Sequence, residues 1–270
     1  MEVKEKKVLV FGSGISGIGA AKLLAQHGAQ VVLYDGNEKL DKAGLLSSLG
    51  GGPKTSVVLG SFPEELLDGL DMVILSPGVP TDLPVVVEMR KRGIQVIGEV
   101  ELAYAFGKGD VLAITGTNGK TTTTSLLGEI MKNYQDNVYI VGNIGNPYTA
   151  VAGQMNENTI TVAEMSSFQL ESIVDFRPKV SAILNFTPDH LNRHHTMEAY
   201  VNAKKNIARN QGPQDYCILN YEDSLTREFG KKVKAQVLYF SSQRKLEKGI
   251  YLEDGNIIYR AGEEVSVCRV

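Results

Sequence analysis

Residues 115–122 read Thr-Gly-Thr-Asn-Gly-Lys-Thr-Thr, a combination of residue types that suits the binding of phosphate groups. The glycines allow backbone N–H groups to close around phosphate oxygens, Lys120 adds a positive charge, and Thr121 offers a hydroxyl to a magnesium ion. Gly116 precedes Gly119 by three positions, so the loop is shorter than the standard G-x-x-x-x-G-K-[ST] pattern. A Gly-Lys-Thr triplet can also be an ordinary helix start. Because an apolar strand precedes this segment and a helix with apolar periodicity follows it, we predict a site for a nucleoside triphosphate.

A second glycine-rich turn, Gly-Ser-Gly-Ile-Ser-Gly at 12–17, also lies between a predicted strand and a predicted helix. It matches the dinucleotide fingerprint, and Asp35 stands 18 residues after Gly17, where an acid usually holds a ribose. Taken alone, this pattern predicts NAD or FAD. A glycine turn at a helix N-terminus suits any pyrophosphate, however, including that of a UDP-sugar. Since a second phosphate loop follows and no hydride-transfer site is evident downstream, we favour one domain for a diphosphate-bearing substrate and one for ATP.

Glu164 ends a predicted strand over 159–163. The carboxyl ends of the strands are the usual place for ligand groups in an open parallel sheet, so Glu164 is expected to bind magnesium beside Thr121. The alternative is an exposed carboxylate at a strand end with no ligand.

A polar segment over 185–194 follows the next predicted strand and contains His190. This suggests a metal or phosphate site, although a lone histidine is more often structural. On the helix that follows, Tyr200 and Lys204 share a face at i and i+4. Lys204 and its neighbour Lys205 would ordinarily be solvated surface charges.

The elements that position these residues alternate between strand and helix, which predicts a parallel α/β architecture. The first domain, 1–98, is predicted to be a Rossmann-like parallel sheet domain. The second domain, 99–270, is predicted to be a P-loop-type α/β domain. After residue 233, four short segments (237–240, 250–252, 257–260 and 265–267) are predicted to form a small antiparallel sheet, with turns such as Asp254-Gly255. The segment 61–64 resembles a capping box before a helix.

Composition excludes several functional classes. The chain has 270 residues, 43% hydrophobic and 22% charged, which is ordinary for a soluble globular protein. A net charge of -3 gives no basic surface for nucleic acid. The sequence has no run of about 18 apolar residues, so we expect no membrane span. The charged N-terminus carries no apolar signal region. The two cysteines lack metal-type spacing, so we expect a reduced, cytoplasmic protein, and we expect a monomer.

Four features in chain order, the segments 115–122, 164–170 and 189–194 and the Tyr200…Lys204 pair, resemble the motifs of the Mur ligase family. The 12–17 loop, the Gly-Asn-Ile-Gly run at 142–145 and the Ser-Ser-Phe-Gln-Leu element most resemble the branch that adds D-glutamate. Mur ligases are ATP-dependent amide ligases that build the peptidoglycan peptide. The resemblance implies that ATP phosphorylates the carboxylate of UDP-N-acetylmuramoyl-L-alanine, and that the amine of D-glutamate attacks the acyl phosphate.

The resemblance also implies residue roles. Thr121 and Glu164 hold one magnesium ion, while His190 and Lys204 serve a second near the acyl phosphate. The lysine that Lys204 matches is carbamylated in this family, which makes it a carboxylate-like ligand. The expected catalytic residues are Lys120, Glu164, His190 and Lys204. The expected ATP-binding residues are Gly116, Thr117, Asn118, Gly119, Lys120, Thr121 and Thr122. The expected residues for the UDP-substrate are Ser13, Gly14, Ile15, Ser16, Gly17, Asp35, Ser76, Pro77, Gly78 and Asn143.

Two departures from the family pattern matter. Asn192 stands where the family commonly has a second aspartate, and because asparagine drops the charge, we assign it no metal role. Family members also carry a third domain that binds D-glutamate and closes over ATP. We therefore expect the central domain of this chain to be incomplete at its C-terminus, and the chain alone to be inactive.

Three alternatives stay open at this point. A sister Mur ligase would add a different amino acid, but sister enzymes use different N-terminal loops. Folylpolyglutamate synthase shares the central phosphate loop but lacks a UDP domain like residues 1–98. A nicotinamide-dependent oxidoreductase or a regulatory dinucleotide-binding module would rest on the 12–17 loop alone.

Overall fold

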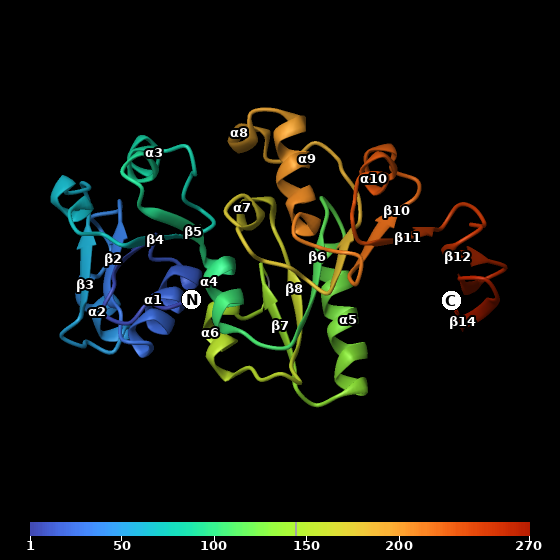
Figure 1. Cartoon of the computed structure of the whole chain (residues 1–270), viewed down its shortest axis with the longest axis horizontal. Helices are drawn as coiled ribbons and strands as arrows, with labels where there is room; N and C mark the ends of the chain where they lie inside the picture. The colour runs from blue at the N-terminus through green and yellow to red at the C-terminus, as the bar shows by residue number, and fades with distance from the viewer. Residues whose placement is uncertain (144) are drawn as a thin grey trace. The chain divides into compact units, whose positions relative to one another are not determined.

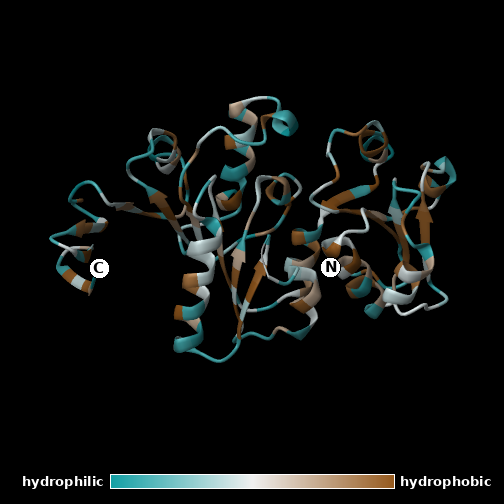
Figure 2. Cartoon of the chain, turned by 180° about the vertical axis from the view of Figure 1, so that it is seen from behind, coloured by the Kyte–Doolittle hydropathy of each residue, from teal (hydrophilic) through white to brown (hydrophobic). Residues whose placement is uncertain are grey.

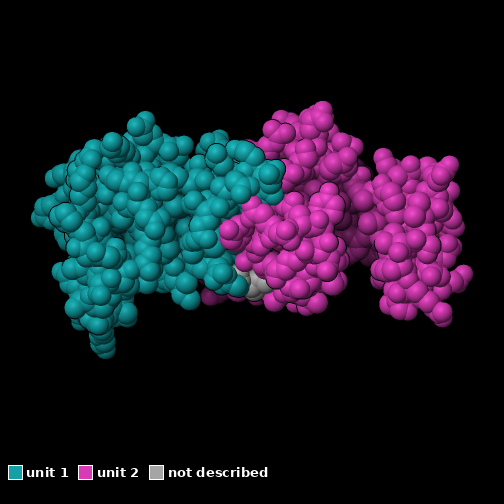
Figure 3. Space-filling model, turned by 90° about the horizontal axis from the view of Figure 1, so that it is seen from below, with its two compact units in different colours: residues 1–109, 141–159, 168–176 teal, residues 110–140, 160–167, 177–270 magenta. Residues whose placement is uncertain are grey.

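The computed structural model describes residues 1–143 and 145–270, so Ile144 of the 142–145 run lies outside the described residues. The chain forms two compact units (Figure 3). Unit 1 comprises 1–109, 141–159 and 168–176, and unit 2 comprises 110–140, 160–167 and 177–270. The domain boundary proposed at residue 98 stays a prediction.

Unit 1 is built on a five-stranded parallel sheet in the order β3-β2-β1-β4-β5 (Figure 1). The chain leaves β1 toward β2 on one side and later returns to place β4 on the other, so the strand order reverses at β1. In open α/β sheets this reversal opens a crevice at the carboxyl ends of the strands. The elements are β1 (Lys7–Phe11), α1 (Ile15–Gln26), β2 (Gln30–Asp35), α2 (Lys42–Ser48), β3 (Thr55–Leu59), η1 (Glu64–Leu67), β4 (Met72–Leu75), α3 (Pro84–Lys91), β5 (Gln95–Gly98), α4 (Glu99–Phe106), α6 (Tyr148–Val151) and η2 (Ala152–Gln154).

The strands of unit 1 are apolar on both faces, as expected of a parallel sheet covered by helices. Val8, Leu9 and Val10 of β1 are fully buried, and so are Val73 and Ile74 of β4. Figure 2 shows these strands as hydrophobic, and this buried sheet holds the loops at its carboxyl ends in fixed positions.

The capping box predicted at 61–64 is wrong. The structure has a single 3-10 turn, η1, with Pro63 at its N-cap and no side-chain cap. Proline occupies the position where a capping side chain would sit, and the turn ends after only four residues.

Unit 2 is built on a nine-stranded mixed sheet in the order β14-β13-β12-β11-β10-β9-β6-β8-β7. Its elements are β6 (Asp110–Thr115), α5 (Lys120–Tyr134), β7 (Val138–Gly142), β8 (Ile160–Glu164), α7 (Ser167–Leu170), β9 (Val180–Ile183), α8 (Leu191–His194), α9 (Met197–Lys205), η3 (Asn206–Ala208), β10 (Tyr216–Asn220), α10 (Ser224–Gly230), β11 (Gln236–Ser241), β12 (Gly249–Glu253), β13 (Asn256–Arg260) and β14 (Glu264–Arg269); β7 and α7 also contribute residues to unit 1.

The predicted antiparallel strands are confirmed for β12, β13 and β14, with Asp254-Gly255 as the turn between the first two. The prediction is wrong for β11, which pairs parallel with both β10 and β12. The antiparallel strands continue the larger sheet, because β11 links them to it. Among the described residues, no helix is both long and apolar enough to cross a bilayer.

Candidate functional site

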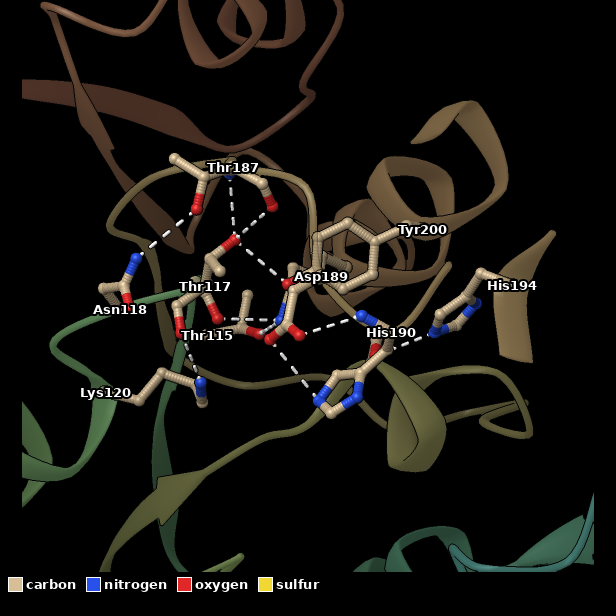
Figure 4. Close-up of polar contacts among 12 residues, drawn as sticks. Thr115, Thr117, Asn118, Lys120, Thr187, Asp189, His190, His194 and Tyr200 are labelled. Carbon is tan, nitrogen blue, oxygen red and sulfur yellow. Dashed lines mark hydrogen bonds and ion pairs between the residues drawn. The ribbon is translucent and has the colours of Figure 1, made fainter. Parts of the chain in front are cut away.

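The phosphate loop of unit 2 connects the end of β6 to the start of α5. Gly116 has a φ of +152°, and a side chain there would meet Leu184 at 3.0 Å, so only glycine fits this turn. Gly119 is the left-handed N-cap of α5. Lys120 is the first residue of the helix, and its Nζ donates to Thr117 O at 2.9 Å (Figure 4). The first backbone N–H groups of α5 have no intrahelical acceptor and are suited to an anion.

Thr121 and Glu164 are brought together as predicted. Thr121 Oγ1 donates to Glu164 Oε2 at 2.8 Å. Glu164 ends β8, is paired with Ile114 of β6, and is only 1% exposed, so it is not a solvent-exposed strand-end carboxylate.

This pair suits Mg²⁺, which prefers hard oxygen ligands and takes most of its coordination from water and phosphate. In the chain apart from residue 144, no group of three or more His, Cys, Asp or Glu could hold a metal by itself. A hydroxyl and a buried carboxylate therefore fit a magnesium ion that arrives with a nucleotide, rather than a metal held by the protein alone.

Lys204 is not the solvated surface charge that lysines usually are. It is 2% exposed, its Nζ donates to Gly116 O at 2.8 Å, and it lies 4.8 Å from the centre of the Tyr200 ring. Burial, and then the charge of Lys120, lower the pKa of Lys204 to about 7, while Asp189 and Glu164 act in the opposite direction. The amine is thus substantially neutral near pH 7. It lies close enough to Lys120, Asp189 and Glu164 for their charges to affect its pKa.

His190 lies at the N-cap of α8. It adopts a left-handed backbone with φ of 51°, its side chain is half exposed, and its Nε2 lies 3.4 Å from Asp189 Oδ2 (Figure 4). The structure therefore pairs His190 with Asp189. Its predicted partnership with Lys204 around a second magnesium stays a prediction.

His194 and Tyr200 are neighbours to which no role was assigned from the sequence. His194 is buried, its Nε2 lies 2.9 Å from Ser167 Oγ, and its ring meets the Tyr200 ring edge to face. The Tyr200 hydroxyl lies 3.0 Å from Thr117 Oγ1 (Figure 4). Burial raises the pKa of Tyr200, so this hydroxyl stays protonated and can donate to the loop. Both residues stand in motifs that the sequence analysis had singled out, but their contacts depend on tertiary structure.

Unit 1 contains a cavity of about 590 Å³, within the range of roughly 300–1,000 Å³ that is typical of small-molecule sites. It opens beside the 12–17 loop and the 76–78 turn, at the reversal of strand order. All the predicted substrate residues line it except Gly17, namely Ser13, Gly14, Ile15, Ser16, Asp35, Ser76, Pro77, Gly78 and Asn143.

Asp35 supports the loop as well as lining the cavity. Its Oδ2 accepts from Ser13 N at 2.9 Å and from Ser13 Oγ at 2.7 Å, and its Oδ1 accepts from Asn37 N at 3.0 Å. Burial alone would raise the pKa of Asp35, but these hydrogen bonds outweigh it and the pKa is lowered. The carboxylate is therefore ionised at neutral pH and holds the start of the glycine loop.

Gln169 and Glu99 form a buried pair behind this cavity that the sequence analysis missed. Gln169 lines the cavity, and its Nε2 donates to Glu99 Oε1 at 2.9 Å. Glu99 is 2% exposed, and its Oε2 is buried without a hydrogen-bond partner in the described part of the chain. Burial raises the pKa of Glu99 to about 6, partly offset by the Gln169 hydrogen bond. Seventy residues separate the pair, so no local pattern could reveal it.

Replacing Glu99 with glutamine is expected to change how stability depends on pH. Because the pKa of Glu99 is raised from 4.5 to about 6 on folding, its contribution is fully present below pH 4.5 and is lost as pH rises through 6. Relative to wild type, Glu99→Gln should gain about 2 kcal/mol between pH 4.5 and pH 7.5. Urea unfolding followed by circular dichroism at both pH values measures this. The exposed Glu65→Gln is the control, and parallel stability profiles for Glu99→Gln and wild type would contradict the expectation.

A phosphate loop at the end of a parallel strand, with a buried carboxylate ending the adjacent strand, is typical of P-loop-type α/β nucleotide-binding proteins. The chain belongs to the Mur ligase family. The family model described as Mur ligase middle domain matches residues 114–269, and the model described as Mur ligase MurD-like, N-terminal domain matches residues 6–98. The family resemblance found in the sequence is thereby confirmed.

Two curated relatives carry the same name. The chain is 57% identical to a UDP-N-acetylmuramoylalanine--D-glutamate ligase from Lachnoclostridium phytofermentans, over 98% of this chain and 59% of that protein. It is 46% identical to the ligase of the same name from Clostridioides difficile, again over 98% of this chain and 59% of the relative. The chain thus spans about 59% of the length of these two proteins.

Solved structures share the fold. The UDP-N-acetylmuramate:L-alanyl-gamma-D-glutamyl-meso-diaminopimelate ligase from Neisseria meningitides has a TM-score of 0.62 at 17% identity, covering 94% of this chain and 84% of that one. The UDP-N-acetylmuramate-alanine ligase MurC from Thermotoga maritima has a TM-score of 0.53 at 22% identity, covering 94% and 56%. These similarities confirm the predicted α/β fold.

Proposed function

We propose that this chain takes part in the ATP-dependent joining of D-glutamate to UDP-N-acetylmuramoyl-L-alanine, through an acyl phosphate, in cytoplasmic peptidoglycan precursor synthesis by a monomeric enzyme. The name shared by its relatives at 46–57% identity supports the choice of D-glutamate over the amino acids of sister ligases. The observation that carries the proposal is the cavity of unit 1, which collects the glycine loop, Asp35, the 76–78 turn and Asn143 around one space of about 590 Å³.

The proposed roles in unit 1 follow from hydrogen-bonding chemistry. The pyrophosphate of the UDP-substrate would lie against the 12–17 loop and the N-terminus of α1, where backbone N–H groups favour an anion. Asp35 would keep this loop in place through Ser13. Asn143 would contact the muramoyl-alanine part. An ionised Asp35 also suits a ribose or uracil donor.

The proposed roles in unit 2 are electrostatic. Phosphoryl transfer to a carboxylate brings two anions together, so catalysis consists largely of positioning and charge stabilisation. Lys120 and the N-terminus of α5 would hold the ATP phosphates, while Thr121 and Glu164 would hold magnesium, which neutralises the charge that develops on the transferring group. Lys204, carbamylated on its neutral amine, and His190 would serve a second magnesium ion.

Calorimetric titration of the chain with UDP-N-acetylmuramoyl-L-alanine, with NADH in parallel, tests the assignment of unit 1. Binding of the UDP-sugar without binding of NADH is the expected result. Binding of NADH alone would return the glycine loop to a dinucleotide-binding role and overturn the ligase proposal.

Asp35→Ala is expected to weaken UDP-sugar binding by about tenfold or more, because the variant loses both the ordered Ser13 and a charged acceptor, and each charge-assisted hydrogen bond contributes roughly 1.5–3 kcal/mol. The same calorimetry measures this. Glu65→Ala removes an equal charge from an exposed position outside the cavity and should bind like wild type. Unchanged affinity in Asp35→Ala would remove Asp35 from the substrate site.

A further inference from the structure

The first half of the phosphate loop of unit 2, residues 115–118, is hydrogen-bonded to residues 184–187, which follow β9. Leu184 N donates to Thr115 O at 3.0 Å, directly continuing the parallel pairing of β9 with β6. Gly116 then passes close to Leu184, and a Cβ on Gly116 would lie only 3.0 Å from the Leu184 Cβ. The loop and the segment 184–187 thus leave adjacent parallel strands and stay together beyond the end of the sheet.

The side-chain carboxamide of Asn185 forms hydrogen bonds with the backbone of this loop, as a peptide group of a neighbouring strand would. Its Oδ1 accepts from Thr117 N at 3.1 Å and from Asn118 N at 2.9 Å. Its Nδ2 donates to Asn118 O at 3.0 Å. One carboxamide therefore engages two successive backbone amides and a carbonyl of a loop that has no regular secondary structure to fix it.

Thr187 closes the same contact two residues later. Its backbone N donates to Thr117 Oγ1 at 3.0 Å, and Thr117 Oγ1 donates to Thr187 O at 3.1 Å (Figure 4). With the Tyr200 hydroxyl as a further donor at 3.0 Å, the Thr117 hydroxyl uses its one donor and both of its acceptor positions. The conformation of residues 117–118 is thus determined from outside the loop, before any ligand arrives.

The hydrogen bonds that hold residues 117–118 limit which groups can bind a ligand. The amides of Thr117 and Asn118 are engaged within the protein, which leaves phosphate oxygens to Lys120 and to the open amides of the first turn of α5. A loop already held in shape loses little conformational freedom when phosphate binds. The segment 184–187 continues to Asp189 and His190. One segment therefore supports both the phosphate loop and His190, the candidate ligand of the second magnesium ion.

We propose that Asn185 is a positioning residue for the triphosphate, which holds residues 117–118 so that the N-terminus of α5 and Lys120 are presented to the phosphate groups. This inference rests on the proposed ATP-dependent function and adds a residue to it. Asn185 acts through the loop and does not itself contact the nucleotide.

The chain offers a matched control in Asn220, at the end of the adjacent strand β10. Asn220 Nδ2 donates to Leu184 O at 2.9 Å, so it supports the same strand end, whereas its side-chain hydrogen bonds involve the backbone at 184 and 222 rather than the phosphate loop. Loss of Asn220 should therefore reduce stability in the same region without releasing residues 117–118.

The experiment titrates wild type, Asn185→Ala and Asn220→Ala with Mg·ATP and with Mg·tripolyphosphate. Asn185→Ala should weaken both ligands by about tenfold or more and by similar factors, since the backbone of the loop must then be ordered on binding. Asn220→Ala should bind both within about twofold of wild type. Equal affinities in Asn185→Ala and wild type, or equal losses in the two variants, would overturn the proposal. If wild type binds neither ligand, the proposed nucleotide function itself fails.

Amide hydrogen exchange gives a second readout that a loss of general stability would not reproduce. The amide of Asn118 should exchange slowly in wild type, quickly in Asn185→Ala, and slowly again in Asn185→Asp, whose carboxylate keeps an acceptor for it. Thr117 N also donates to the backbone O of Asn185 at 3.1 Å, which alanine retains, so the Thr117 amide should exchange slowly in all three proteins and serves as the internal reference. Rapid exchange of these two amides in the wild-type protein would overturn the proposal, even if Asn185→Ala fails to fold.

Discussion

Lys204→Arg is expected to lower the rate of the proposed ligase reaction by about 100- to 1,000-fold or more, the loss typical when one group that stabilises transition-state charge is removed. Arginine keeps a positive charge at this position but cannot become a carbamate, because its guanidinium is never neutral in proteins. A buried cation would then stand where the proposed mechanism needs a magnesium ligand. Phosphate release in the presence of the proposed substrates measures the effect.

The chemical basis is the unusual state of the Lys204 amine. Carbamylation joins a neutral amine to carbon dioxide and releases a proton, so a lysine with an ordinary pKa of 10.5 would be almost entirely unreactive at pH 7. Burial lowers the pKa of Lys204 to about 7, which makes the neutral form abundant. The carbamate would also replace a buried cation beside Lys120 with an anion, which relieves the repulsion between the two lysines.

Labelling with ¹³C-bicarbonate tests this state directly. Wild type should show one carbamate carbonyl signal at pH 7.5 that is lost reversibly by pH 6, as the amine becomes protonated, and Lys204→Arg should show none. Lys205→Arg is the matched control, since Lys205 is the next residue on α9 and only half buried. Full activity in Lys204→Arg would remove Lys204 from the mechanism.

Local sequence signals were enough to predict much of the fold. The segments 7–11 and 72–75 are short apolar runs between turn residues, and 99–106 is a helix that begins directly after glycine; the structure has β1, β4 and α4 at these residues. Thr196 is the N-cap of α9, and this cap is also local, because its Oγ1 accepts from Ala199 N at 3.1 Å. Such signals involve residues close together in the sequence, so they do not depend on which elements pack against them.

Strand direction and helix exposure depend on partners far away in sequence. β11 has the composition of the antiparallel strands after it, yet β10 and β12 make it parallel. The apolar periodicity of α5 predicts a buried face, but Leu126 is 61% exposed and Ile130 is 54% exposed. Periodicity identifies the helix and its apolar side without fixing how much of that side is covered.

The candidate site divides in the same way. The residues of the two glycine loops were identifiable, because a loop motif combines all its functional groups in a few positions. The contacts of Asn185, Gln169 and Glu99 were not, because each of these residues meets a partner about 70 residues away. Their positions at or after strand ends were the available signal, and only the pairing of the strands shows which partner each one meets.

Gly17→Ala is expected to lower the free energy of unfolding by about 3 kcal/mol or more, the upper range for overpacking a well-packed site. A Cβ on Gly17 would lie 1.8 Å from Gly12 O and 2.8 Å from Ser76 Oγ. Gly12 cannot move easily, since its φ of +101° and its N–H bond to Tyr34 O fix the turn. Urea unfolding followed by circular dichroism is the measurement, and a stability equal to that of wild type would contradict this geometry.

Gly14→Ala separates the stability of the loop from its binding function. The backbone of Gly14 has a φ of -65°, which alanine adopts freely, and a Cβ there meets nothing within 4 Å. Its stability should therefore stay within about 0.5 kcal/mol of wild type. Gly14 lines the cavity, however, so the added methyl group should keep a pyrophosphate away from the backbone and weaken UDP-sugar binding. A Gly14→Ala protein that is stable and binds the UDP-sugar like wild type would place the pyrophosphate elsewhere in the cavity.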